Sequence, residues 1–160
     1  MTSTAPRAFA LTAAAAFGLA LLSGAPVGAA DLDPAKVVTT ADVEKVMGGK
    51  WTSRSPEPGV LFYEEDGTGY RSVHVYLWPA DGKTVADMMP NLIQQGEPVK
   101  EVAGVGEAAM YRPQRNEATT EKKDKSGELL WLSIAVLEAA SPADTKRFAV
   151  ELAQRGVARI

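Results

Sequence analysis

The sequence predicts an α+β fold in which helices pack on one face of a mostly antiparallel sheet. Short strand patterns are joined by glycine-containing turns of hairpin length, which favours antiparallel pairing. Amphipathic helical patterns follow groups of strands instead of alternating with single strands. Both halves run strand, strand, strand, helix and are weakly similar, with Leu77 and Leu137 ending the long strands 60 residues apart.

The first predicted elements are a helix and a short strand. Thr39 begins a Thr-x-x-Asp capping signal with Asp42, and the apolar helical spacing that follows stops at the glycine pair 48–49. Residues 50–53 are compatible with a short strand. The prolines and glycine of segment 55–59 predict a loop after it.

A hairpin is predicted from residues 60–66 and 70–78, because β-branched and aromatic runs flank a Gly-Thr-Gly turn. Successive side chains of a strand point to opposite faces of a sheet. Val73, Val75 and Leu77 are therefore expected to face the core. The opposite face then carries aromatic and hydrogen-bonding side chains, namely Tyr70, Ser72, His74, Tyr76 and Trp78.

A second helix is predicted from apolar residues at helical spacing that run from Val85 to Ile93. Pro90 interrupts this pattern. Because an interior proline costs about 3 kcal/mol, the helix either kinks at Met89 or begins near Asp87, with the proline in its first turn.

The back half is predicted to hold four strands and a terminal helix. Two short strands flank a Gly-Val-Gly bend and two longer ones form a hairpin; they cover residues 99–103, 107–112, 118–123 and 129–137. Ser141, Pro142 and Asp144 supply an N-cap, a proline at the first helical position and a capping partner, which together predict the start of the last helix.

Residues 1–30 have the pattern of a cleaved secretory signal. Arg7 precedes an apolar run from Ala8 to Leu22, and small residues follow up to Ala30. The alternative, a retained membrane anchor, needs roughly 20 apolar residues to span a bilayer, and this run is shorter. Cleavage near Ala30 would leave residues 31–160 as one α+β domain without a membrane span, periplasmic or secreted.

Composition removes several classes of function. The chain has no cysteine and a single histidine, so disulfides, thiolate catalysis, lipid anchoring through cysteine and multi-histidine metal sites are excluded. All 20 acidic residues but only 16 of the 17 basic ones follow residue 30, which leaves a net charge of −4 there. A nucleic-acid partner would need a basic face and is not expected. No cofactor is expected either.

Three segments and a terminal helix carry a resemblance to known proteins. The segments are Thr39–Val43 leading to the glycine pair 48–49, Phe62-Tyr63, and Val102–Tyr111 with its Gly-Val-Gly-Glu-Ala-Ala sequence. In this order they resemble exported actinobacterial cell-envelope lipoproteins of unknown function, although this chain lacks their lipid-anchoring cysteine. The resemblance covers most of the chain after residue 30. It implies an α+β envelope protein without known enzymatic activity.

The aromatic strand face is the candidate ligand-binding surface. Tyrosine, tryptophan and histidine offer stacking area with a polar tip, which suits ligands with flat or sugar-like surfaces. The expected partner is therefore a small ligand or an envelope protein. The alternative is a sheet face that a loop covers or that is left in solvent without a function. The candidate residues are Tyr70, His74, Tyr76, Trp78 and Trp131.

Two other functions are considered. His74 could serve a hydrolase or isomerase as general base if a cleft joined it to a carboxylate such as Glu64 or Glu107. A copper(I) carrier would use soft ligands, although methionines on the apolar stripes of helices are ordinary core residues. Its candidate ligands are Met47, Met88, Met89, Met110 and His74.

Overall fold

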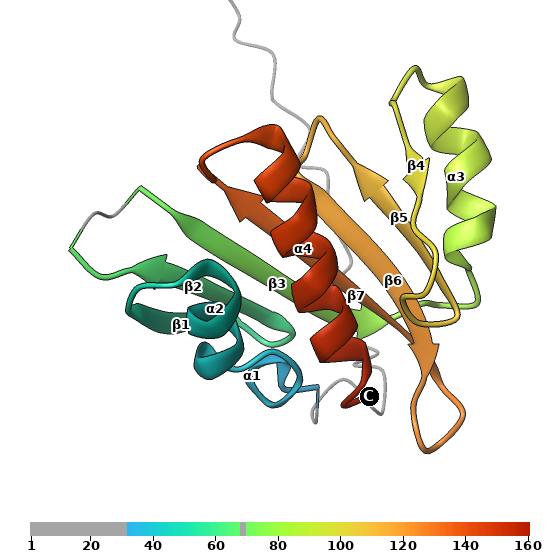
Figure 1. Ribbon diagram of the computed structural model, residues 1–160. Helices are drawn as coiled ribbons and strands as arrows, with labels where there is room; N and C mark the ends of the chain where they lie inside the picture. The colour runs from blue at the N-terminus through green and yellow to red at the C-terminus, as the bar shows by residue number, and fades with distance from the viewer. Residues whose placement is uncertain (1–31, 68–69) are drawn as a thin grey trace, which may run out of the picture.

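The computed structural model describes residues 32–67 and 70–160, and the predicted signal segment, residues 1–30, lies outside the described residues. Seven strands form one antiparallel sheet in the order β1-β2-β3-β7-β6-β5-β4 (Figure 1), so the predicted α+β fold is confirmed. The strands are β1 (Trp51–Glu57), β2 (Val60–Glu65), β3 (Ser72–Pro79), β4 (Lys100–Glu101), β5 (Ala108–Arg112), β6 (Glu117–Lys123) and β7 (Leu129–Leu137). The helices are α1 (Pro34–Val37), α2 (Thr40–Met47), α3 (Val85–Gln94) and α4 (Pro142–Val157).

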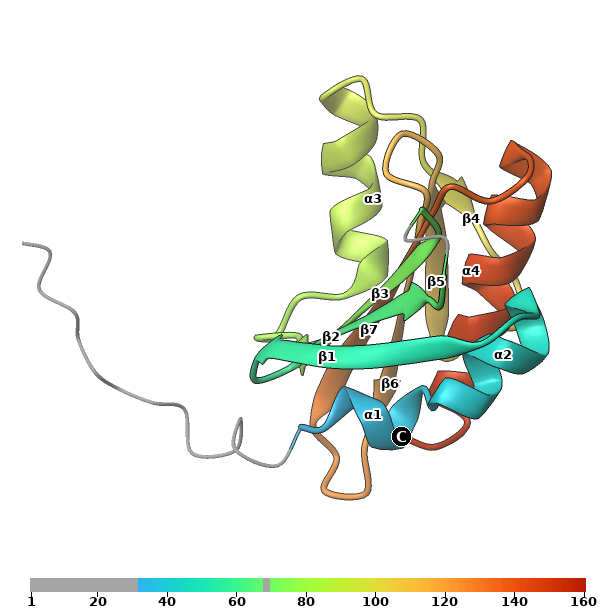
Figure 2. The same ribbon diagram turned by 90° about the vertical axis from the view of Figure 1, so that its left-hand side faces the viewer.

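Helices lie on both sides of the sheet (Figure 2). The face covered by α1, α2 and α4 is the core face, where α4 packs along β6 and β7. The helix α3 lies against the other face, beside β5 and β6. The expectation that helices pack on one face therefore fails for α3, because α4 already occupies the core side of the same strands. Among the described residues, no helix is long and apolar enough to cross a membrane.

The core lies between the sheet and the helices α2 and α4. Val73 and Val75 are fully buried and Leu77 is 2% exposed, as the alternation in the sequence predicts. They belong to one buried cluster with Leu132 of β7 and Leu152 of α4. Burying such side chains is the main favourable contribution to folding, about 25 cal/mol for each Å² of apolar surface.

A buried carboxylate joins α2 to the segment that follows α4. Thr39 and Asp42 form the predicted capping box at the start of α2. Asp42 also accepts a hydrogen bond of 2.9 Å from the guanidinium of Arg159, which follows α4. Burial acts to raise the pKa of Asp42, but hydrogen bonds from Arg159 and Thr39 outweigh it and lower the pKa to about 2. The charged pair thus holds α2 against the end of α4.

The Gly-Val-Gly bend before β5 has a packing role. Val105 is 3% exposed within the core, and its carbonyl oxygen accepts a hydrogen bond of 3.1 Å from Thr120. Gly106 has a φ of +61° and lies so close to Thr120 and the backbone oxygen of Glu121 that a Cβ atom would collide with both. Only glycine combines that φ with that approach.

The predicted hairpins are confirmed, but β1 differs from its prediction. β2 pairs with β3, β4 with β5, and β6 with β7. The segment 55–59 was expected to be a loop, yet β1 continues to Glu57 and pairs there with Val60. Pro56 is tolerated because β1 is an edge strand, where an absent N–H needs no partner.

The helix α3 begins earlier than Asp87. Thr84 caps it and forms a capping box with Asp87, so the first helical residue is Val85 and Pro90 lies inside the helix. The capping energy and the exposed position of the helix offset the one backbone hydrogen bond that the proline removes. The short helix α1 was not anticipated from the sequence.

Both halves contain three strands followed by a helix, β1–β3 with α3 and β5–β7 with α4. Leu77 pairs with Leu132 and faces the core, whereas Leu137 pairs with Ser72 and borders a hollow on the other face. The 60-residue spacing between the two leucines therefore does not join equivalent positions.

Candidate functional site

The face of the sheet opposite α4 carries a row of aromatic rings along β3. His74, Tyr76 and Trp78 alternate with the buried residues of that strand, and Trp78 is 36% exposed. The ring centroids of His74 and Tyr76 are 6.4 Å apart, and those of Tyr76 and Trp78 are 5.5 Å apart. Both contacts are edge-to-face, a favourable geometry for aromatic pairs. We call His74, Tyr76 and Trp78 the aromatic row.

Phe62 of β2 supports one end of the aromatic row. Its ring centroid lies 4.1 Å from that of His74, and the Arg54 guanidinium lies 4.9 Å from the Phe62 ring centroid on the edge strand. Burial and the nearby Arg54 lower the pKa of His74, against the opposing charge of Glu64. His74 is therefore a neutral imidazole at pH 7, held by its neighbours as a flat surface.

A hollow of about 610 Å³ lies between the aromatic row and the β5–β6 turn. We call it the β5–β6 hollow. It is lined by the aromatic row together with polar side chains from the turn, including Arg112, Gln114, Asn116 and Glu117. Burial, with the charge of Glu117 adding to it, raises the pKa of Tyr76, so this phenol stays protonated and can donate a hydrogen bond.

The charged side chains of the β5–β6 hollow are paired. Arg112 donates two hydrogen bonds to Glu97, from Nε at 2.7 Å and from Nη2 at 2.9 Å. These bonds lower the pKa of Glu97. The Arg112 Nη1 atom lies 3.6 Å from Glu117, which also accepts a hydrogen bond of 2.9 Å from Thr119. Such bidentate pairing fixes the guanidinium plane, so this wall is rigid and polar without excess charge.

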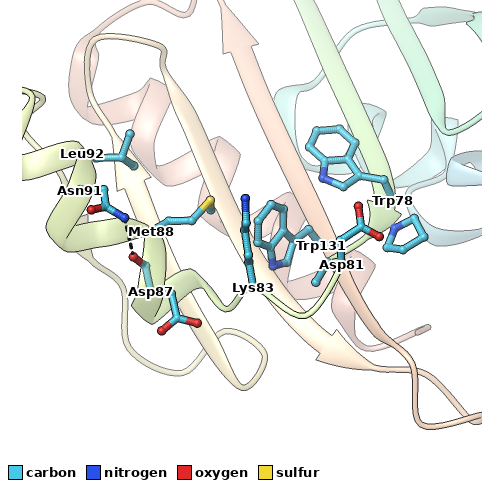
Figure 3. Close-up of a pocket in the computed structure, with 10 residues that line it drawn as sticks. Trp78, Asp81, Lys83, Asp87, Met88, Asn91, Leu92 and Trp131 are labelled. Carbon is cyan, nitrogen blue, oxygen red and sulfur yellow. Dashed lines mark hydrogen bonds between the residues drawn. The ribbon is translucent and has the colours of Figure 1, made fainter. Parts of the chain in front are cut away.

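A second hollow, of about 520 Å³, lies between α3 and the ends of β3 and β7. We call it the α3 hollow, and Figure 3 shows its walls. Trp78 and Trp131 come from the sheet, while Met88 and Leu92 come from α3. Trp78 lines this hollow and the β5–β6 hollow alike. The two hollows therefore meet at one indole.

The indole nitrogen of Trp131 is the unusual polar atom of the α3 hollow. Nε1 is buried and has no hydrogen-bond partner within the described part of the chain. A buried donor without a partner costs about 1–3 kcal/mol, and nearly all such groups in proteins are satisfied. Lys83 lines the same hollow and is exposed, so its flexible side chain forms one border of the site.

The helix α3 is held in place by a carboxylate beneath it. Glu121 of β6 is 6% exposed, and it accepts a hydrogen bond of 2.5 Å from the backbone N–H of Val85, the first helical residue. A carboxylate at this position satisfies one of the free N–H groups of the first turn and complements the helix dipole. The α3 wall of the hollow is thereby fixed to the sheet.

The structure brings together four of the five candidate ligand-binding residues. His74, Tyr76, Trp78 and Trp131 share the open face, and Trp78 and Trp131 are direct partners across β3 and β7. Tyr70 precedes β3, is 74% exposed, and has no ring contact with the aromatic row among the described residues. It lies outside the site because the strand begins only at Ser72.

The carboxylates considered for acid–base chemistry do not bond to His74. Glu64 pairs instead with Arg54 at 3.1 Å, and Glu107 accepts a hydrogen bond of 3.2 Å from the backbone of Lys123. The hydroxyl of Ser72 is 3.4 Å from the imidazole Nε2. These contacts leave His74 without an orienting carboxylate in the described chain.

The proposed copper ligands are dispersed. Met47 is in the core beside α4, while Met88 and Met89 are on α3 across the sheet. In the described ranges, no group of three or more histidine, aspartate or glutamate side chains could hold a metal ion.

The sequence did not predict which side chains other elements contribute beside the aromatic row. Arg112 lines the β5–β6 hollow, Met88 lines the α3 hollow, and Phe62 packs against His74. The Thr84-x-x-Asp87 capping box was a usable sign that α3 starts close after β3. Comparisons of the chain with protein-family models, curated proteins and solved structures find no match.

Proposed function

We propose that this chain is an exported, non-catalytic domain that binds a small uncharged ligand with a flat ring face. The observation that carries the proposal is the aromatic row, half-buried at His74 and Tyr76 and exposed at Trp78, bordered by two hollows that meet at Trp78. Binding sites for small molecules are typically concave, about 300–1,000 Å³ in volume, and combine aromatic surface with a few polar groups. Both hollows fall in this range. Export rests on the signal pattern of residues 1–30.

The charges favour an uncharged ligand. In the β5–β6 hollow the two arginines, Arg112 and Arg115, are matched by Glu97 and Glu117. Asp81, Lys83 and Asp87 border the α3 hollow. In the β5–β6 hollow, a bound anion would have to displace these ion pairs, and a bound cation would compete with the arginines. A ligand that hydrogen-bonds to these groups and stacks on the rings avoids both costs.

The same contacts argue for binding instead of catalysis. A general base needs a reachable proton and an orienting partner. His74 packs on Phe62, and neither Glu64 nor Glu107 is bonded to it. A small ligand also explains the two concave hollows better than an envelope protein does, because protein partners usually cover flatter and larger areas.

Ligand-detected saturation-transfer NMR tests this proposal. The probes are glucose, N-acetylglucosamine, their β-1,4-linked disaccharides and indole, each added to the protein from residue 31 onward. We expect transfer from at least one probe, and loss of it in the double variant Tyr76→Ser, Trp78→Ser. Tyr70→Ser is the matched control, since Tyr70 is an exposed tyrosine outside both hollows.

Two results would contradict the proposal. In the first, the double variant folds, as its circular dichroism shows, and still binds the same probe. In the second, none of the probes binds the unaltered protein at millimolar concentration.

A further inference from the structure

We propose that the two hollows form one extended site for a linear, uncharged oligosaccharide whose rings carry acetamido groups. This inference rests on the proposed function and names the ligand class that fits the same surface. Three observations support it: Trp78 lines both hollows, the aromatic row repeats along β3, and the buried Nε1 donor of Trp131, which lines the α3 hollow, has no partner among the described residues.

The length of the site indicates that the ligand has more than one sugar ring. From His74 to Trp78 the strand advances four residues, about 13 Å at the usual rise. Neighbouring ring centroids in the aromatic row are 6.4 and 5.5 Å apart, close to the length of one sugar ring in a linear chain. The α3 hollow continues the site beyond Trp78. A monosaccharide would fill only part of this surface.

The chemistry of the α3 hollow indicates that the sugar rings of the ligand carry acetamido groups. The Trp131 Nε1 donor needs an acceptor, and Met88 and Leu92 provide apolar surface in the same hollow. An acetamido group offers a carbonyl oxygen for the donor and a methyl group for the apolar wall. A hydroxyl can accept the hydrogen bond but leaves the apolar wall without a contact. Lys83 lines the same hollow with an exposed side chain, which can change rotamer as a ligand enters.

The β5–β6 hollow supplies partners for sugar hydroxyls. Gln114 and Asn116 offer amide donors and acceptors, and Glu117 is an acceptor held beside Arg112. Planar amide, carboxylate and guanidinium groups can each bond two neighbouring hydroxyls. The apolar face of each sugar ring then rests on one ring of the aromatic row, since neighbouring rings meet edge to face.

Isothermal titration calorimetry with four probes tests the inference. The probes are N-acetylglucosamine, its β-1,4-linked dimer and tetramer, and the glucose tetramer with the same linkage. We expect the N-acetylated tetramer to bind at least tenfold more tightly than the monomer and at least fivefold more tightly than the glucose tetramer. Equal affinity for monomer and tetramer would overturn the extended site, while the small-ligand proposal would stand.

Two variants test the role assigned to Trp131. Trp131→Phe keeps an aromatic ring and removes the donor, and Met88→Ser removes the apolar wall from a half-buried position on α3. Both should reduce the preference for the N-acetylated tetramer over the glucose tetramer to less than twofold. Ile93→Ala is the control, because Ile93 is 56% exposed on α3 outside the α3 hollow. An unchanged preference in Trp131→Phe would overturn the assignment of the acetamido group.

Discussion

Trp78 of β3 and Trp131 of β7 stand directly opposite each other on the open face of the sheet. One indole is partly exposed, and the other has a buried nitrogen without a hydrogen-bond partner among the described residues. Paired residues on adjacent antiparallel strands share a face and lie about 5 Å apart. The pair therefore joins the two central strands at the point where the two hollows meet.

Adjacent residues of β3 should differ sharply in their effect on stability. Leu77 is buried in the core, so Leu77→Ala should cost about 2–5 kcal/mol. Trp78 is on the open face, so Trp78→Ala should cost about 1 kcal/mol or less, mainly through its lost contact with Tyr76. Urea unfolding followed by circular dichroism measures both. A larger loss for Trp78→Ala would mean that the open face is part of the core.

The two glycines of the Gly-Val-Gly bend should respond differently to alanine. Both have a positive φ, and an alanine with such a φ lowers the stability of the fold by about 1 kcal/mol. A Cβ on Gly106 would also collide with Thr120 and the Glu121 backbone, whereas one on Gly104 meets nothing within 4 Å in the described chain. Gly106→Ala should therefore lower the thermal midpoint clearly more than Gly104→Ala. Equal shifts in calorimetry would contradict the close approach at Gly106.

Removal of the Asp42 charge should lower the free energy of unfolding in a defined pH range. The pKa of Asp42 is 3.8 ordinarily and about 2 in the fold, so the charged form stabilises the folded state by about 2 kcal/mol above pH 4. This contribution is lost as the pH falls through 2. Asp42→Asn should lack this contribution and should therefore be less stable than the unaltered protein at pH 7. The difference from the unaltered protein should shrink between pH 4 and pH 2 in urea unfolding, and a constant difference would refute the charge-based explanation.

His74 should make the protein less stable in mild acid. Its pKa lies below the ordinary 6.5 in the fold, so the unfolded chain binds the proton more readily. The stabilising effect of the neutral ring is complete above pH 6.5 and declines as the pH falls toward the folded pKa. His74→Phe keeps a ring against Phe62 and should remove this decline. Thermal midpoints of both proteins at pH 7.5 and 5.5 measure this decline. An identical decline in the two proteins would contradict the role of His74.

Local features of this chain were readable from the sequence. The Thr39–Asp42 box and the Ser141–Asp144 cap both form, because a capping side chain bonds to a backbone group only three residues away. The alternation along β3 placed Val73 in the core and His74 on the other face, because side-chain direction in a strand depends only on the period of two.

The tertiary structure alone decided which side α3 covers and how the open face becomes concave. These outcomes depend on contacts between distant residues, such as Val85 with Glu121 and Arg112 with Glu97. A single sequence contains the residue types for such pairs but not their partners, since many charged pairings are compatible with one pattern. Packing selects among them, because α4 fills one side of β6 and β7 and leaves α3 the other. The aromatic row was therefore predictable, whereas the hollows on either side of it required the assembled fold.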